Sequence, residues 1–418
     1  MHFKIGALKA LCLCGSDTGS GLEAYRHLHS HADHTIRMSW QPTFRQHFPV
    51  LRDLRYANVA YTSPLAPVVS EAIGAFLASI TYARSDKPLW LREADTCRSK
   101  IARLINGHAR QVAFTKNTCE ALNLVAQGLR WRPGENLVTN DQEHPSSLLP
   151  WLNLRDRGVE VRVVRARNRE IVLDELLANI DNNTRVVAVS WVQSTSGQRL
   201  DLKTLSAVCR ARGIRLVVDA IQGLGLLDLD LTDTPIDALA SGAHKGLLGP
   251  LGIGFVHLSK LLLDELEPAY LGPSAVTQIA FDGEDYSPDY KDRLDARRLE
   301  TGNINYVGVA GLTRALDLIL AAKPNRIEPW VTSLSLAFAG RLRASGIDVI
   351  TPAGDTSNTT GPITTIRVQN ALALNVALRE ANVIASVVER DYARFAFGAY
   401  NTTQDMDSIA DIVLQHVK

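Results

Sequence analysis

The feature of this sequence that most limits its fold is a series of short apolar runs between residues 112 and 258. Their β-branched and apolar residues are typical of buried strands, and helix-like stretches lie between them. Strands joined by helices of about 10 to 15 residues need crossover connections, which produce a mostly parallel sheet. We therefore predict an α/β domain of three layers. Its strands are expected at residues 112–115, 136–139, 159–164, 185–192, 214–219, 236–241 and 252–258.

The pattern changes after about residue 307, where a long helical stretch is followed by short elements. A strand at 361–368, a helix at 372–381, strands at 383–388 and 394–397 and a last helix from residue 403 predict a smaller α+β domain. We expect a disordered leader at 1–37, an N-terminal segment with the large domain at 38–307, and the small C-terminal domain at 308–418.

The predicted leader contains four histidines at a spacing that could bind a metal. Nothing in its Gly/Ser-rich sequence would hold the imidazoles in place, so a disordered segment is the better interpretation and no metal site is expected. Met38 is a candidate natural start. The histidines are His27, His29, His31 and His34.

Charge and cysteine usage narrow the class of protein. The 45 Lys and Arg residues against 44 Asp and Glu give a net charge of +1, which argues against a nucleic-acid or anionic-membrane partner. Five scattered cysteines at no zinc spacing indicate neither a disulfide framework nor a structural zinc site, so reduced cytoplasm is expected. No apolar stretch is long enough to cross a membrane. Small-molecule chemistry is favoured.

The clearest candidate for that chemistry is Lys245, which follows a predicted strand in the segment Ser241–Gly246. A lysine at the end of a buried strand is costly unless its pKa is lowered or its amine is bonded covalently. A Schiff base with an aldehyde cofactor would satisfy this condition. The alternative is a surface lysine in a turn.

Other polar residues also follow predicted strands, where ligands of parallel sheets bind. Asp219 could pair with a pyridine nitrogen, and Gln222 could contact a ring oxygen. The alternative role for Asp219 is that of a helix N-cap, which is common for aspartate. Thr118 and Cys119 begin a helix whose free amides suit a phosphate. His144 could stack on a planar ring or be structural.

Together these segments resemble the class V aminotransferase family of pyridoxal-phosphate enzymes, which includes cysteine desulfurases, selenocysteine lyases and isopenicillin N epimerases. The likeness extends from about residue 48 to residue 414, with the motifs in the family's order. The family has the PLP-dependent transferase type I fold. The matching segments are Phe48-Pro49-Val50-Leu51, Glu143-His144, Pro150-Trp151, His244-Lys245 with Gly249-Pro250, Glu300-Thr301-Gly302-Asn303 and Tyr400-Asn401-Thr402.

The resemblance implies a role for each candidate residue. Lys245 would carry pyridoxal 5'-phosphate as a Schiff base and act as a catalytic base, with Asp219 on the pyridine nitrogen and His144 on the ring face. Gln222 would contact the ring oxygen, and Arg394 would bind the substrate carboxylate. A homodimer with shared sites is implied as well. The phosphate candidates are Thr118, Cys119, Ser241, His244 and, from the second subunit, Asn303.

One departure from the family concerns the reaction. In desulfurases, a long loop of the small domain carries the persulfide-forming cysteine. Here the segment at that place, residues 384–394, is short and contains no cysteine. We therefore expect an enzyme that abstracts the Cα proton of a small amino acid, or of an amino-acid-derived substrate, bound as an external aldimine, with transamination or a related outcome. A carbon–sulfur lyase or an amino-acid epimerase is the alternative. A non-catalytic cofactor-binding scaffold is the alternative of another class.

Overall fold

The computed structural model describes residues 40–281, 286–353, 360–388 and 391–417. At its centre is a seven-stranded sheet with the strand order β2-β8-β7-β6-β5-β3-β4. The pairs that join β4, β3, β5, β6 and β7 are parallel, as predicted. The strands are β2 (Val112–Thr115), β3 (Asn136–Asn140), β4 (Glu160–Val164), β5 (Thr184–Ser190), β6 (Arg215–Asp219), β7 (Ala238–Gly242) and β8 (Gly254–Leu258).

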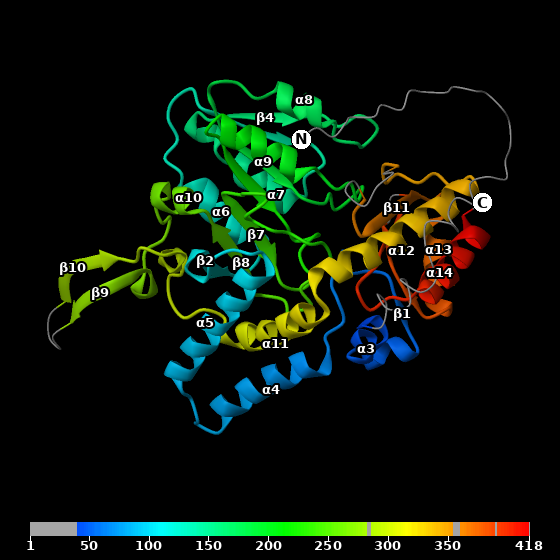
Figure 1. Ribbon diagram of the computed structural model, residues 1–418, viewed down its shortest axis with the longest axis horizontal. Helices are drawn as coiled ribbons and strands as arrows, with labels where there is room; N and C mark the ends of the chain where they lie inside the picture. Colours follow the sequence, from blue (N-terminus) through cyan, green and yellow to red (C-terminus); the bar gives the residue numbers. More distant parts are fainter. Residues whose placement is uncertain (1–39, 282–285, 354–359, 389–390, 418) are drawn as a thin grey trace, which may run out of the picture.

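Both faces of this sheet are apolar and covered. On β5, Val186 and Ala188 belong to one buried cluster, whereas Val187 and Val189 belong to the other. Because successive side chains of a strand point to opposite faces, helices must cover both sides, and the three-layer α/β prediction is confirmed (Figure 1). The helices of this part include α6 (Thr118–Gly128), α7 (Pro145–Leu152), α8 (Leu173–Ala178), α9 (Leu202–Ala211) and α10 (Lys260–Glu265).

The prediction of a helix after every strand is wrong at two places. Within the described chain, residues 220–237 and 243–253 form turns and irregular segments instead of α-helices. Strand β8 runs antiparallel to both of its neighbours, so a short connection from β7 is sufficient. Lys245 lies in that connection.

Three helices lie side by side below the sheet in Figure 1: α4 (Pro67–Thr81), α5 (Lys87–Leu104) and α11 (Tyr306–Ala322). The carboxylate of Asp86 caps α5 by accepting a hydrogen bond from the Leu89 backbone at 3.0 Å. The long helical stretch expected after residue 307 is two helices, because α12 (Pro324–Ala344) begins at a proline that follows Lys323 at φ 71°.

The C-terminal part is α+β, as predicted. A three-stranded antiparallel sheet has the order β11-β14-β13 and packs with α12 and α13. The predicted strand at 383–388 is two strands, because β12 pairs with the N-terminal segment and β13 pairs with β14. The elements are β11 (Ile363–Arg367), α13 (Ala371–Glu380), β12 (Val383–Ile384), β13 (Ser386–Val388), β14 (Tyr392–Ala396) and α14 (Thr403–His416).

The N-terminal segment of the described chain packs against this C-terminal part. Strand β1 (Arg55–Tyr56) is parallel to β12, and α3 (Trp40–Gln46) brings Arg45 to Asp405, with 2.7 Å between Nη1 and Oδ2. These contacts tie residues 40–56 to α14 and β12, while the division into 38–307 and 308–418 stays a prediction. Residues 1–39, including the four leader histidines, lie outside the described residues.

A hairpin of β9 (Val276–Phe281) and β10 (Tyr286–Asp292) was not predicted. It projects from the large domain on the side of β2 and α10 (Figure 1). Strand β10 has the sequence YSPDYKD, and proline and aspartate are depleted in strands. Local propensity therefore gives a strand signal for β9, whose sequence is VTQIAF, but not for its partner β10.

Candidate active site

The carboxyl ends of the parallel strands form the candidate site. Asp219 is the last residue of β6, where it lies beside Ser190 of β5 and Ala240 of β7. Lys245 follows the end of β7 by three residues, and His144 follows the end of β3 by four. Parallel strands bring these ends to one edge of the sheet, as the sequence predicted.

Lys245 occupies a turn whose backbone is held from several sides. The hydroxyl of Ser63 donates to the Lys245 carbonyl at 2.9 Å, and the Ser63 amide donates to the His244 carbonyl at the same distance. Behind it, Gly225 at φ 83° allows close approach to Gly246, because a Cβ on Gly225 would lie 2.2 Å from the Gly246 carbonyl oxygen. The turn therefore presents the lysine in a defined position.

The Lys245 amine loses its proton more readily than an ordinary lysine does. Within the described part of the chain, its Nζ makes no hydrogen bond or ion pair. Burial lowers the pKa of Lys245 to about 8, against an opposing effect of Asp219. This burial argues against the alternative interpretation of Lys245 as a surface lysine in a turn.

Asp219 is a buried carboxylate with donors on both oxygens. The Ser147 hydroxyl donates to Oδ2, and the Ile221 amide donates to Oδ1 at 2.9 Å. Burial raises the pKa of Asp219, while the Ser147 bond, Lys245 and His144 act in the opposite direction. The carboxylate is therefore held in place and faces two basic groups.

His144 caps helix α7 and is half-buried. Its Nδ1 accepts a hydrogen bond from the Ser146 amide at 3.2 Å, so the neutral ring carries its proton on Nε2. Burial, then the charge on Lys245, lowers the pKa of His144. The ring is therefore neutral at pH 7, and its stacking role stays a prediction.

Arg394 extends from the small sheet to the same site. Its Nη1 donates to the Ser194 carbonyl at 2.6 Å, while its buried Nε has no partner within the described residues. Its charge contributes to lowering the pKa of both Lys245 and His144, so the guanidinium lies within electrostatic reach of them. The structure thus brings four of the predicted residues together.

Most of the predicted phosphate candidates lie at the start of α6 and the end of β7. Thr118 Oγ1 accepts a hydrogen bond from the Gly242 amide at 2.9 Å. A Cβ on Gly242 would lie 3.4 Å from the His244 ring, and burial lowers the pKa of His244 to about 4. Ser241 donates to the Gly242 carbonyl at 3.0 Å. Cys119 lies one residue into α6, where Asn123 Nδ2 is 3.6 Å from its sulfur.

Gln222 lies beneath the site and is buried. Its Nε2 donates to the Ala60 carbonyl at 3.1 Å. An amide nitrogen has two hydrogens, so one remains for a second acceptor. The predicted contact of Gln222 with the ring oxygen stays a prediction.

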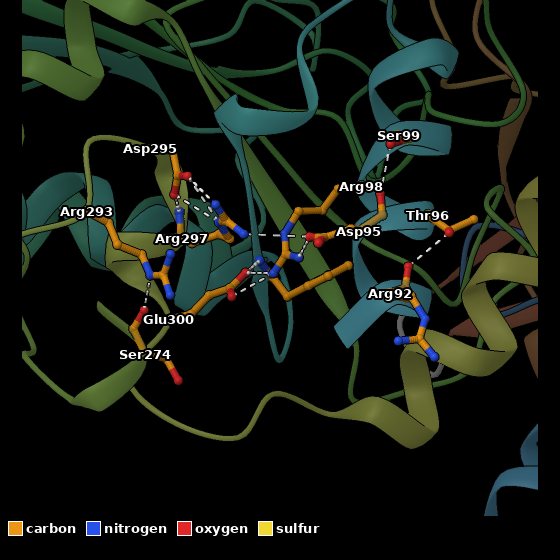
Figure 2. Close-up of polar contacts among 11 residues, drawn as sticks. Arg92, Asp95, Thr96, Arg98, Ser99, Ser274, Arg293, Asp295, Arg297 and Glu300 are labelled. Carbon is orange, nitrogen blue, oxygen red and sulfur yellow. Dashed lines mark hydrogen bonds and ion pairs between the residues drawn. The ribbon is translucent and has the colours of Figure 1, made fainter. Parts of the chain in front are cut away.

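Asn303 is exposed and lines a pocket of about 290 Å³ together with Thr115, Glu120 and Tyr270. Neither Lys245 nor Asp219 lines that pocket. Figure 2 shows the polar cluster that anchors the segment before Asn303, in which Arg98 Nη2 is 2.7 Å from both Glu300 oxygens. The Phe114 amide also donates to Glu300, at 2.8 Å, which joins this segment to β2.

Three neighbours of the site were missed from the sequence: Glu143, Ser147 and Ser63. Glu143 is buried and accepts hydrogen bonds from Asn140 and Gln193 and from the Ser190 backbone at 2.7 to 3.0 Å. Ser147 lies three residues after His144, one helical turn, so helix spacing would have identified it. No local signal identifies Ser63, because its partners are 182 residues away.

Metal-ligating and thiol side chains form no further candidate site within the described residues. Within the described residues, no group of three or more His, Cys, Asp or Glu side chains could hold a metal ion. Cys97 and Cys209 are buried free thiols, as predicted. No described helix combines the length and apolarity needed to span a membrane.

Comparison with known proteins agrees with this geometry. The family model Aminotransferase class-V matches residues 56–409. A probable cysteine desulfurase of Methanothermobacter thermautotrophicus is 33% identical over 326 residues, which cover 76% of this chain and 79% of that protein. An isopenicillin N epimerase of Streptomyces clavuligerus is 36% identical over 220 residues, or 50% of this chain and 55% of that protein.

The fold has solved counterparts. The apo structure of a cysteine desulfurase from Thermococcus onnurineus NA1 superposes with a TM-score of 0.80 at 23% identity, covering 90% of this chain and 98% of that one. That likeness confirms the predicted type I fold. Since the family model covers nearly all of the described residues, the chain belongs to the class-V aminotransferase family, whose members use pyridoxal 5'-phosphate.

Proposed function

We propose that this protein is a pyridoxal-phosphate enzyme that removes the Cα proton of a small amino acid or an amino-acid-derived substrate, with transamination as the favoured outcome. The observation that carries the proposal is the Lys245 amine, whose pKa is lowered to about 8 beside Asp219, His144 and Arg394. A base with a pKa near the working pH is best matched to proton transfer.

The residues present fit the cofactor. Lys245 is an amine without a described partner, and Asp219 is a buried carboxylate suited to a protonated ring nitrogen. The first turn of α6 offers backbone amides beside Thr118 and Cys119, where a phosphate is stabilised. When bound, pyridoxal phosphate supplies an aldehyde for amino groups and a ring that accepts electron density from Cα.

Each predicted contact has a defined donor or acceptor. Lys245 would hold the cofactor covalently, His144 would cover the ring face and Gln222 would donate its second amide hydrogen to the ring oxygen. His244 is a further phosphate donor in this proposal. Ser241 would have to rotate, because its single hydroxyl hydrogen is used on the Gly242 carbonyl.

Different residues of the chain would bind the substrate and move its proton. Arg394 would bind the α-carboxylate through the edge of its guanidinium that has no described partner. Lys245, once released from the cofactor, would take the proton from Cα. Asp219, which Ser147 and the Ile221 amide hold in place, would pair as a carboxylate with the protonated ring nitrogen.

Carbon–sulfur lysis and epimerisation begin with the same proton removal and are the second candidates. The likeness to an isopenicillin N epimerase supports epimerisation. A persulfide route is not favoured, because residues 384–394 contain no cysteine. The complete set of Lys245, Asp219, His144 and Arg394 argues against a non-catalytic scaffold, which needs no such set.

The experiment is a panel of amino acids given to the cofactor-loaded protein. Keto acid, inverted stereochemistry and sulfide are measured for each. Keto acid from a co-substrate-dependent reaction supports transamination, and inverted product or sulfide supports one of the alternatives. If no amino acid changes the cofactor absorbance or yields product, the proposed function is wrong.

We further propose a homodimer in which Asn303 reaches the partner's phosphate site. Near its C-terminal end, helix α4 presents Leu77 and Ile80 to solvent on one face, each at 48% exposure. A mostly apolar cavity of about 300 Å³ lies between α4, α5 and α11. Exposed apolar surface of this kind marks an interface, and a second copy is its expected occupant.

The free thiols of Cys97 and Cys209 accord with a cytoplasmic location.

A further inference from the structure

A cationic cluster lies on the small sheet beside Arg394. Successive side chains of a strand alternate between faces, so Tyr392 and Arg394 of β14 point to the same face, about 7 Å apart along the strand. Arg367 of β11 is paired with Tyr392, and Thr365 is paired with Arg394. This face therefore carries two guanidinium groups and one phenol in a row.

A third guanidinium reaches this face from the large domain. The Arg169 Cζ lies 4.4 Å from the centroid of the Tyr392 ring, and its Nη2 donates to the Tyr392 hydroxyl. The Arg367 Cζ lies 5.4 Å from the same centroid. Arg367 is neutralised by Asp348, at 2.9 Å, whereas Arg169 and Arg394 have no carboxylate partner within the described residues.

One loop holds both unneutralised arginines in position. The Gln198 side chain makes two hydrogen bonds of 2.8 Å to the Ile171 backbone, two residues beyond Arg169. In the same loop, the Ser194 carbonyl accepts from Arg394 at 2.6 Å and the Thr195 carbonyl accepts from Thr365 at 2.6 Å. Arg169 and Arg394 are thus fixed relative to each other by segments far apart in the sequence.

Two fixed cations without counter-charges repel each other, so this arrangement favours a ligand with two negative groups. The Arg394 Nε is buried and without a partner, which leaves that guanidinium incompletely satisfied. We propose that the substrate carries a second acidic group at the end of its side chain. Arg394 binds the α-carboxylate, and Arg169, positioned by Tyr392, binds the distal acid.

This inference rests on the proposed function for its substrate, but binding tests it separately. Calorimetry on the cofactor-loaded protein would measure dissociation constants for succinate, glutarate and adipate, and for butyrate as the single-acid control. The best diacid is expected to bind at least about tenfold more tightly than butyrate, because its second carboxylate gains charge-assisted hydrogen bonds to Arg169. Arg169→Gln should remove that advantage.

Kinetics would then compare aspartate and glutamate with asparagine and glutamine. In the native enzyme, the acids are expected to have the higher kcat/KM. Arg169→Gln should raise KM for the acids about tenfold or more, leave kcat nearly unchanged and leave the amides unaffected. Arg169→Lys should recover part of the loss. Arg165→Gln removes the same charge from an exposed position of the same loop and is the matched control.

The outcomes separate the two proposals. If amino acids react but glutamine is used as well as glutamate, or if Arg169→Gln slows acids and amides by the same factor, the distal acid site is wrong and the proposed function stands. If diacids bind through Arg169 but no amino acid reacts, the anion site stands and the proposed function is wrong. Equal binding of butyrate and the diacids in calorimetry also overturns the site.

Discussion

Ser147 donates a hydrogen bond to Asp219, and this bond joins the first turn of α7 to the end of β6. Because His144 caps the same helix, one short segment both covers the site and holds its buried carboxylate. The bond also opposes the rise in the pKa of Asp219 that burial causes. The position and the pKa of this carboxylate therefore depend on two segments together.

Replacing Asp219 with asparagine is expected to lower turnover about 100-fold or more while the protein stays folded, because the charge partner of the ring nitrogen is lost. Ser147→Ala keeps the carboxylate and should reduce turnover less. Steady-state kinetics and the cofactor absorbance measure both effects. Near-normal turnover in Asp219→Asn would contradict the proposed role of this carboxylate as the charge partner of the ring nitrogen.

Covalent attachment of the cofactor is expected at Lys245. Reduction with borohydride followed by peptide mapping should place the label on this residue. Lys245→Arg should abolish the label, because a guanidinium cannot form the bond. Lys116→Arg changes an exposed lysine and should leave labelling intact. A label on any other lysine contradicts the assignment.

The proposed dimer depends on the apolar face of α4. Leu77→Glu combined with Ile80→Glu should give a monomer at micromolar concentration in sedimentation velocity, because buried unpaired charges are costly. Activity should fall with it, since the partner's Asn303 is lost from the site. Leu372→Glu, on α13 at 74% exposure, is the control and should leave the dimer intact. A fully active monomer would exclude Asn303 from the site.

The buried imidazole of His257 predicts a loss of stability in acid. Its side chain is 4% exposed, neither ring nitrogen has a partner within the described residues, and burial lowers its pKa to about 4. Between pH 6.5 and pH 4, this imidazole binds a proton in the unfolded chain but stays neutral in the folded chain. The free energy of unfolding therefore falls as the pH decreases towards 4. His257 should account for about 2 kcal/mol between pH 7 and pH 4.5.

Urea unfolding of His257→Leu at those two pH values measures this contribution. The difference in free energy of unfolding between the two pH values should shrink by about 2 kcal/mol relative to the native protein. His47→Gln removes an exposed imidazole of the N-terminal segment and should leave the difference unchanged. An unchanged pH dependence in His257→Leu would show that the ring is accessible to protons when folded.

None of the cysteines is expected to be an obligatory sulfur carrier. Burial raises the pKa of Cys97 and of Cys209 to about 12, so both thiols stay protonated and poorly nucleophilic. A variant with alanine at these positions, threonine at 119 and serine at 12 and 14 should retain most of its turnover. Abolished turnover in a folded, cofactor-loaded variant would restore a persulfide mechanism.

The strands of the large sheet and the polar residues at their ends can be located from local sequence patterns. Runs such as 112–115 and 214–219 are apolar and β-branched over a few residues, and this local pattern is enough to locate a buried strand. Asp219 and Lys245 were identifiable because strand ends are where a parallel sheet presents polar groups. These features depend on neighbours within a few residues.

Other features depend on how distant segments pack: the direction of β8, the pairing of β1 with β12 and the partners of the site residues. An apolar run reveals that a strand is buried, but not which strand lies beside it or in which direction. Contacts such as Ser147 with Asp219 and Arg169 with Tyr392 join residues 72 and 223 positions apart. They form when segments pack, and side-chain fit between distant segments leaves no periodic signal in the chain.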